Sequence, residues 1–291
     1  NFNPNYPGIE FDYASNFKNC VFEITQDYFG DATFYKHVDL AHVKGIDFQG
    51  CDFSLAQNVT GVSTWNHAIA GYTAKFGVSA ICNSPQNPCP EIEYDRSTFT
   101  GFYSAVNADN EGYPVTFSVN RADFINNAYG VKTHYMNNAS VLFSNFEIGN
   151  LWDCGAGIFS DNITGLAFEE NEFSKYMGGP VSDYFGIIIN NSEAVNEVYK
   201  NNYTGLSYAN FSDGKNWFGG NIWEGLAYYC NENENNYADF YVADDTMPNK
   251  HSGIQSFQGN DYYTAGNTFT QSGATWHFYN GANSGKATLS I

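Results

Sequence analysis

The segment Leu166-Ala-Phe168-Glu-Glu-Asn171-Glu-Phe173 decides the fold of this 291-residue chain. Its pattern is apolar, any, apolar, any, any, then a small residue, Asn or Cys, then any residue and an aromatic. The same pattern ends at Phe53, Phe99, Phe124 and Phe146, and looser copies end at Phe22, Tyr203 and Phe269. An internal repeat of this kind indicates a chain built from stacked, equivalent units.

The spacing of the copies indicates what the unit is. The terminal aromatics at positions 99, 124, 146, 173 and 203 are 25, 22, 27 and 30 residues apart. That length suits one turn of a β-solenoid with two or three short strands. The wider gaps, 53 to 99 and 203 to 269, are expected to hold a coil or two with a degraded motif. The sequence therefore predicts an all-β chain, a parallel β-helix of about ten or more coils, as a single domain over residues 1–291.

Stacking gives each motif position a structural role. Side chains alternate between interior and exterior along a strand, so the terminal aromatics are predicted to be buried in one stack. Asn at the sixth position is expected at a repeated corner, where it bonds its neighbour in the next coil. Cys20 and Cys51 share that position, and we interpret them as small buried corner residues rather than a functional pair. The glycines that precede apolar runs are expected at corners that need positive φ; they are Gly130, Gly157, Gly186, Gly205 and Gly225.

Composition excludes several function classes. Aromatics make up 18% of the chain and the formal net charge is −19, with Arg96 and Arg121 the only arginines. Such an acidic chain repels nucleic-acid phosphates and anionic membranes. No apolar run reaches the 18 residues that suggest a spanning helix, so membrane insertion is not expected. The charge is compatible with Ca²⁺ as a cofactor, although solubility is the favoured explanation.

The cysteines point to an oxidising environment. Cys82 and Cys89 flank a proline-rich loop whose ends can approach, which predicts a disulfide. No Cys or His pair has zinc spacing, so no metal site is predicted. The chain begins at Asn1 without Met, and we expect it to be a segment of a longer secreted protein. The predicted location is extracellular or on the outer cell surface.

The repeat resembles that of pectate-lyase-like right-handed parallel β-helix proteins. Three segments, 128–131, 184–192 and 226–233, also look like β-helix regions of surface proteins that Bacteroidetes export through type IX secretion. The resemblance covers nearly the whole chain and implies a right-handed solenoid in a secreted protein. It leaves the activity open, because a fold does not fix a function.

The resemblance raises the alternative of a carbohydrate-active enzyme, most simply a polysaccharide lyase. A lyase needs carboxylates and a base, and the candidates are Glu93, Asp95 and Arg96, which we place on one strand. A solvated strand face with an ion pair explains the same residues and is favoured. The Gly-His-Gly and Arg-x-Lys motifs of polygalacturonase-type glycosidases are missing.

Two further features suggest ligands or modification. Aromatic residues gather between 208 and 223, and the glycan-binding candidates among them are Tyr208, Trp217, Phe218 and Trp223. Exposed aromatic rings can stack on sugars, although filling an irregular coil is the favoured explanation for this cluster. Thr246, in Asp245-Thr246-Met247, resembles a short O-glycosylation site of Bacteroidetes secreted proteins. The favoured function is a non-catalytic scaffold or adhesin whose partner is a polysaccharide or another cell-surface component; the oligomeric state is left open.

Overall fold

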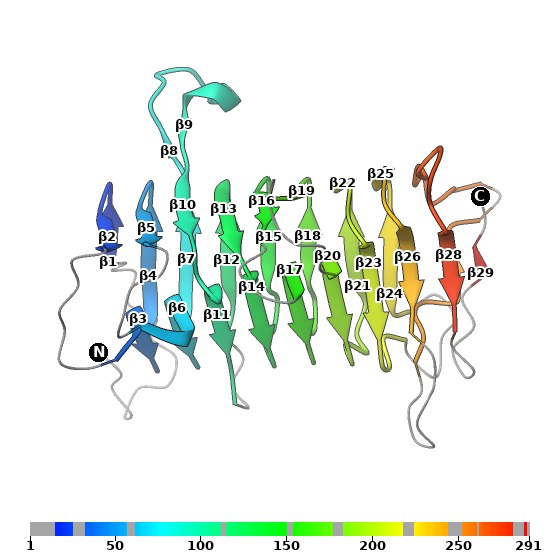
Figure 1. Ribbon diagram of the computed structural model, residues 1–291, viewed down its shortest axis with the longest axis horizontal. Helices are drawn as coiled ribbons and strands as arrows, with labels where there is room; N and C mark the ends of the chain where they lie inside the picture. The colour runs from blue at the N-terminus through cyan, green and yellow to red at the C-terminus, as the bar shows by residue number, and fades with distance from the viewer. Residues whose placement is uncertain are drawn as a thin grey trace.

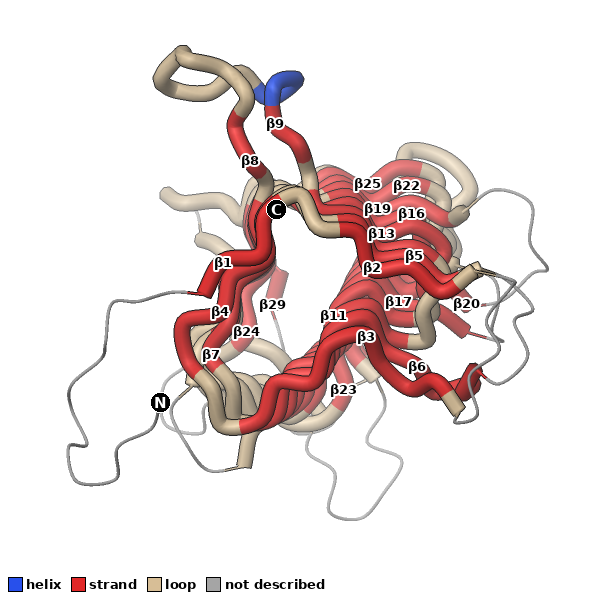
Figure 2. Tube along the Cα trace, turned by 90° about the vertical axis from the view of Figure 1, so that its left-hand side faces the viewer, coloured by secondary structure: helices blue, strands red, loops and turns tan. Residues whose placement is uncertain are grey.

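The chain forms a parallel β-helix, as the repeat predicts (Figures 1 and 2). The computed structural model describes residues 15–25, 33–56, 62–111, 115–149, 154–176, 183–217, 224–243, 252–260, 262–281 and 288–289. In this part of the chain three parallel sheets of eight, eight and nine strands run side by side along the molecule. Sheets of this size fit the expected parallel β-helix of many coils.

The first sheet carries the two apolar positions that open the motif. Its strands, in spatial order, are β1 (Ser15–Lys18), β4 (Lys44–Gln49), β7 (Lys75–Ser79), β12 (Phe117–Asn120), β15 (Ser140–Leu142), β18 (Ala167–Glu169), β21 (Asn196–Tyr199) and β24 (Leu226–Tyr229). The second sheet carries the terminal aromatic. Its strands are β2 (Val21–Ile24), β5 (Asp52–Leu55), β10 (Ser97–Thr100), β13 (Ala122–Asn127), β16 (Asn145–Ile148), β19 (Glu172–Lys175), β22 (Asn202–Thr204) and β25 (Glu232–Glu234).

The third sheet has nine strands and closes each coil. Its strands are β3 (Phe34–Ala41), β6 (Val62–Tyr72), β11 (Ser104–Asp109), β14 (Tyr129–His134), β17 (Cys154–Asp161), β20 (Asp183–Asn190), β23 (Tyr208–Asp213), β26 (Ala238–Val242) and β28 (Trp276–Asn280). A short antiparallel pair, β8 (Ile81–Cys82) and β9 (Tyr94–Asp95), projects from the body, and β27 (Phe257–Gln258) pairs with β29 (Thr288–Leu289).

An aromatic stack fills the second sheet's side of the interior. It runs Phe22, Phe53, Phe99, Phe124, Phe146, Phe173 and Tyr203, with centroid distances of 4.5 to 5.0 Å and ring planes within 9° of parallel. The five Phe residues that the repeat predicts to be buried are at most 2% exposed, which confirms that prediction. At the next rung Asn233 pairs with Tyr203, so the gap from 203 to 269 does hold a coil with a degraded motif.

The gap from 53 to 99 is different, because β5 pairs directly with β10. This gap is one coil, enlarged by the long β6 and by the projecting hairpin, and the expectation of extra coils there is wrong. In the copy that ends at Phe99, the two apolar positions of the pattern fall on Ile92 and Tyr94, but these residues lie in the hairpin, so that assignment is wrong. Phe76 and Val78 of β7 occupy their position, against Phe117 and Val119. The hairpin leaves and re-enters at a corner, so the stack continues undisturbed.

The sixth motif position forms a buried polar ladder. Asn171, Asn201 and Asn231 are fully buried, and the backbone N–H of each donates to Oδ1 of the next Asn, ending at Asn267. Each side-chain amide also donates to a carbonyl inside the coil below, as Asn201 does to Phe168 at 2.8 Å. Positive φ belongs to the preceding residue, such as Glu170 and Lys200, rather than to the Asn itself.

The strand glycines have a different purpose from the one expected. Gly205 and Gly225 do have positive φ, whereas Gly130, Gly157 and Gly186 lie within strands without it. A Cβ on Gly157 would lie 2.5 Å from the Phe173 ring, and Gly130 and Gly186 face Phe146 and Tyr203 equally closely. These three glycines are therefore required by contact with the aromatic stack, not by a corner.

Candidate functional site

The outer surface of the nine-stranded sheet carries a row of aromatic side chains. Along β14 Lys132 alternates with the buried Val131 and Thr133 and lies half-buried on the outside, as Phe211 does along β23. Tyr129 also lies half-buried on the outside, at the start of its strand, with two consecutive buried residues between it and this alternating run. Parallel register then brings equivalent outward residues of successive coils next to each other. We call this surface the aromatic face; its members are Trp65, Tyr103, Tyr129, Phe159, Phe185, Tyr208, Phe211, Tyr237, Tyr241, Trp276 and Tyr279.

The aromatic face is most continuous over β20 to β28. Phe185 and Tyr208 stack at 4.9 Å between centroids, and Phe211 stacks on Tyr241 at 5.4 Å. Tyr241 stacks in turn on Tyr279 at 4.5 Å. Trp276 and Tyr237 are 42% and 49% exposed, so their rings remain open to a ligand.

A second group covers the coils nearer the N-terminus. Trp65, 63% exposed, lies 4.6 Å from Tyr103, which contacts Tyr129 edge to face at 5.4 Å. Lys132 holds its ammonium 5.7 Å from the Tyr129 ring and 5.8 Å from Phe159, within the range of cation–π attraction. The group therefore combines apolar ring surface with a hydrogen-bond donor.

Burial and neighbouring groups favour the neutral, hydrogen-bond-donating form of two tyrosines of the aromatic face. Burial, and then the neighbouring Cys154, raise the pKa of Tyr129. Burial also raises the pKa of Tyr208, with the carboxylate of Asp183 acting in the same direction. A neutral phenol both donates and accepts a hydrogen bond, which suits hydroxyl-rich ligands.

A polar row runs beside the aromatic face. His134 lies between two carboxylates of neighbouring coils: Nδ1 is 3.3 Å from Asp109 and Nε2 is 2.9 Å from Asp161. In register with them follow Asn190 and Asp213. The aromatic face is thus bordered by oxygen acceptors that can bond hydroxyl groups.

Of the two glycan-binding candidates that lie in the described residues, Tyr208 belongs to the aromatic face and Trp217 does not. Tyr208 is the first residue of β23. Trp217 lies beyond the end of the same strand, where it forms an isolated β-bridge with Gly225 at a different corner. The structure therefore separates these two glycan-binding candidates. Phe218 and Trp223 lie outside the described residues, as does the O-glycosylation candidate Thr246.

The lyase candidates do not form the strand face that was expected. Glu93 lies in a 3₁₀ turn, η1 (Glu91–Glu93), and Asp95 in the short β9, so that expectation is wrong. Arg96 instead bonds Asp123 at 2.7 Å and Glu91 at 2.9 Å, and donates to two backbone carbonyls. Its guanidinium is occupied in tying the hairpin to the next coil.

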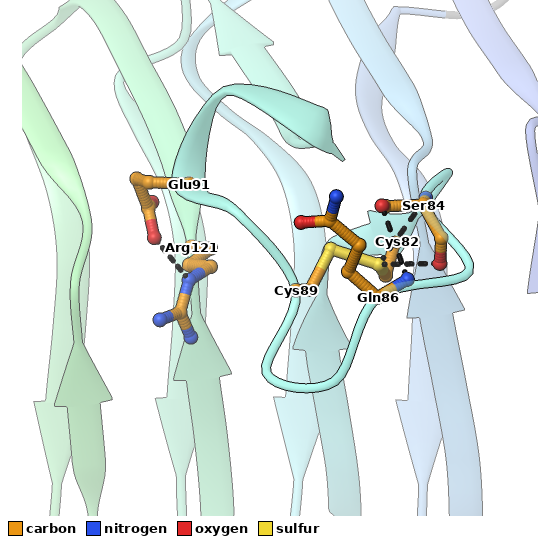
Figure 3. The surroundings of a disulfide bond; sticks show 6 residues. All are labelled: Cys82, Ser84, Gln86, Cys89, Glu91 and Arg121. Atoms are coloured by element: carbon orange, nitrogen blue, oxygen red, sulfur yellow. Dashed lines mark hydrogen bonds and ion pairs between the residues drawn. A yellow bond between two sulfur atoms is a disulfide. The ribbon is translucent and has the colours of Figure 1, made fainter.

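Two interactions hold the projecting hairpin (Figure 3). Cys82 and Cys89 form a disulfide that closes the loop. Arg121 of the neighbouring coil bonds Glu91 of the short 3₁₀ turn at 2.9 Å and places its guanidinium 4.4 Å from the centroid of the Tyr94 ring. The hairpin is therefore a fixed projection rather than a free loop.

Within the ranges described above, no group of three or more His, Cys, Asp or Glu side chains is arranged to hold a metal ion. No helix in the same ranges is long and apolar enough to cross a membrane.

The aromatic face went unseen in the sequence because each coil contributes only one or two of its residues. Tyr129, Phe159 and Phe185 are separated by a coil length, so they form no local cluster. The sequence signal that could have revealed the face is an aromatic residue that recurs from coil to coil, at the start of or within a strand whose side chains alternate between inside and outside. Searches against family models, curated proteins and solved structures find no match for this chain.

Proposed function

We propose that this chain is an extracellular, non-catalytic β-solenoid that binds polysaccharide along its aromatic face, as a surface scaffold or adhesin. The observation that carries the proposal is the row of outward rings over successive coils, from Trp65 to Tyr279. Large contiguous apolar surface on a protein exterior usually marks a binding site.

The chemistry of the face fits a sugar polymer. One face of a pyranose ring presents C–H groups to an aromatic ring, while its hydroxyls point sideways to donors and acceptors. Tyr208 and Lys132 supply donors, and Asp161 supplies an acceptor beside the rings. The coils repeat about every 4.8 Å, a length close to that of one sugar ring, so a polymer along the axis can meet equivalent contacts repeatedly.

Charge favours a neutral polymer. The chain has a net charge of −19, which disfavours alginate or polygalacturonate unless cations screen the repulsion. Xylan, mannan and mixed-linkage β-glucan are therefore the first ligands to test.

The extracellular location and the Bacteroidetes type IX export route belong to the same proposal. They rest on the resemblance of the repeat, and the disulfide between Cys82 and Cys89 supports an oxidising environment.

Affinity electrophoresis in gels containing each polymer tests the proposal. The variants Trp276→Ala and Tyr237→Ala remove exposed rings of the aromatic face, and Tyr262→Ala, 91% exposed, is the matched control outside it. Loss of one aromatic anchor is expected to weaken binding about 5- to 30-fold, equivalent to about 1–2 kcal/mol. Equal retardation of all three variants and the wild type, or none with any neutral polymer, would contradict the proposal.

The lyase alternative is tested on the same preparations. Uronate polymers with Ca²⁺ are expected to yield no unsaturated product. Product that forms with the wild type and disappears in Arg96→Ala would favour the lyase.

A further inference from the structure

Cys20 and Cys51 occupy the same rung of two consecutive coils. The first sheet pairs Lys18 with Gln49 and the second pairs Val21 with Asp52, so the corners between them lie one above the other. The Asp52 N–H donates to the Cys20 carbonyl at 2.9 Å. Adjacent coils are about 4.8 Å apart, and a disulfide spans Cα separations of about 4.4–6.8 Å.

The two thiols also point the same way. Cys20 Sγ lies 3.4 Å from the Lys18 carbonyl, and Cys51 Sγ lies 3.5 Å from the Gln49 carbonyl, so both follow the same local geometry. Cys51 Sγ reaches into the first coil as well, 3.3 Å from the Phe17 carbonyl. Both thiols therefore lie at the same corner, where the first coil meets the second.

This rung contains a weak point of the polar ladder. Asn side chains join the later coils through hydrogen bonds such as Asn171 to Asn201 at 2.9 Å, and Ser144 takes part through its hydroxyl. Thiols are weak donors and acceptors, so the bond that Cys51 makes to the Phe17 carbonyl of the first coil is weaker than the amide bonds of the later coils. The first coil also needs it most, because every residue of β1 is exposed.

We propose that Cys20 and Cys51 are a modification site: they form a disulfide that fastens the first described coil to the second. The oxidant is a low-molecular-weight disulfide such as oxidised glutathione. The half-buried Cys20 meets it first; its thiolate attacks one sulfur and releases one glutathione thiolate. Cys51 then loses its proton to solvent, attacks the Cys20 sulfur and releases the second glutathione. Two protein thiols are oxidised and one glutathione disulfide is reduced to two thiols.

The test uses the full chain equilibrated with excess oxidised glutathione. The protein is denatured with an alkylating agent and no reductant, digested, and analysed by mass spectrometry. A peptide pair linked through Cys20 and Cys51 is expected. Recovery of both cysteines alkylated or glutathionylated, or of Cys20 linked to another cysteine, would overturn the proposal.

Two variants and a second readout check what the link does. Cys51→Ser should leave Cys20 alkylated or glutathionylated, whereas Cys154→Ser should leave the link intact. Amides of residues 15–24 should exchange with deuterium about tenfold more slowly in the oxidised wild type than in Cys51→Ser. Equal exchange would refute the fastening of the first coil.

Discussion

The polar ladder is predicted to be a major source of stability, and Asn201→Ala tests it. Oδ1 of Asn201 accepts the backbone N–H of Asn171 at 3.0 Å, and its side-chain amide donates to the Phe168 carbonyl at 2.8 Å. The side chain is fully buried. Truncation therefore leaves one backbone N–H and one backbone carbonyl without these partners, in places where water has little access.

The magnitude follows from those two groups. Each buried polar group left unsatisfied costs about 1–3 kcal/mol, so Asn201→Ala is expected to lower the free energy of unfolding by about 2–6 kcal/mol. Asn201→Ser should recover part of this loss, because Ser144 bonds the backbone N–H of Ala122 at the same rung position of its own coil, at 3.1 Å.

Urea unfolding followed by circular dichroism measures the effect. The midpoint of Asn201→Ala should fall by on the order of 1 M. The adjacent Asn202→Ala is the matched control: it is exposed, and its cost should stay within about 0.5 kcal/mol. If the two alanine variants unfold at the same urea concentration, the reasoning about the ladder is wrong.

Three further predictions concern packing, pH and the hairpin. Gly157→Ala should destabilise by about 1–3 kcal/mol because its Cβ meets the Phe173 ring, and Phe173→Leu should relieve part of that cost in the double variant, as thermal unfolding would reveal. Burial lowers the pKa of His37 from 6.5, so the folded state binds its proton more weakly and stability should fall as the pH drops below 6.5; in His37→Phe, urea midpoints should change less between about pH 7 and pH 5. Alkylation of the denatured, unreduced protein should leave Cys82 and Cys89 unmodified, and labelling of both would disprove their disulfide.

The interior could be predicted because every coil must place the same kind of side chain at the same position of the stack. A ring such as Phe146 must pack on Phe124 and Phe173, so the aromatic recurs at a fixed place in the motif and can be read from one sequence. The corner ladder was predictable for the same reason. The strand glycines were misassigned because a glycine that avoids an aromatic ring and a glycine that needs positive φ look alike in sequence.

The insertions between strands and the outward-facing side chains could not be predicted in the same way. An insertion at a corner, such as the hairpin between β7 and β10, leaves the pairing of Phe53 with Phe99 intact, so the stack does not report it. The local cluster from 208 to 223 suggested one platform. One coil of some 25 to 30 residues, however, passes through all three sheets of the solenoid. Residues close in sequence, such as Tyr208 and Trp217, can therefore lie on different sides of the molecule.

This difference also bears on where function can arise in the molecule. Val131 and Thr133 of β14 are buried, and changes there disturb the neighbouring coils on both sides. Tyr129 and Lys132 of the same strand lie partly in solvent, where substitution leaves the stack in place. A run of aromatic residues on that freer surface is not required by stacking, since Asn107 and Ala156 occupy equivalent positions in the same sheet. The rings of the aromatic face are therefore not fixed by the interior of the solenoid, which leaves this surface available for the ligand contact that we propose.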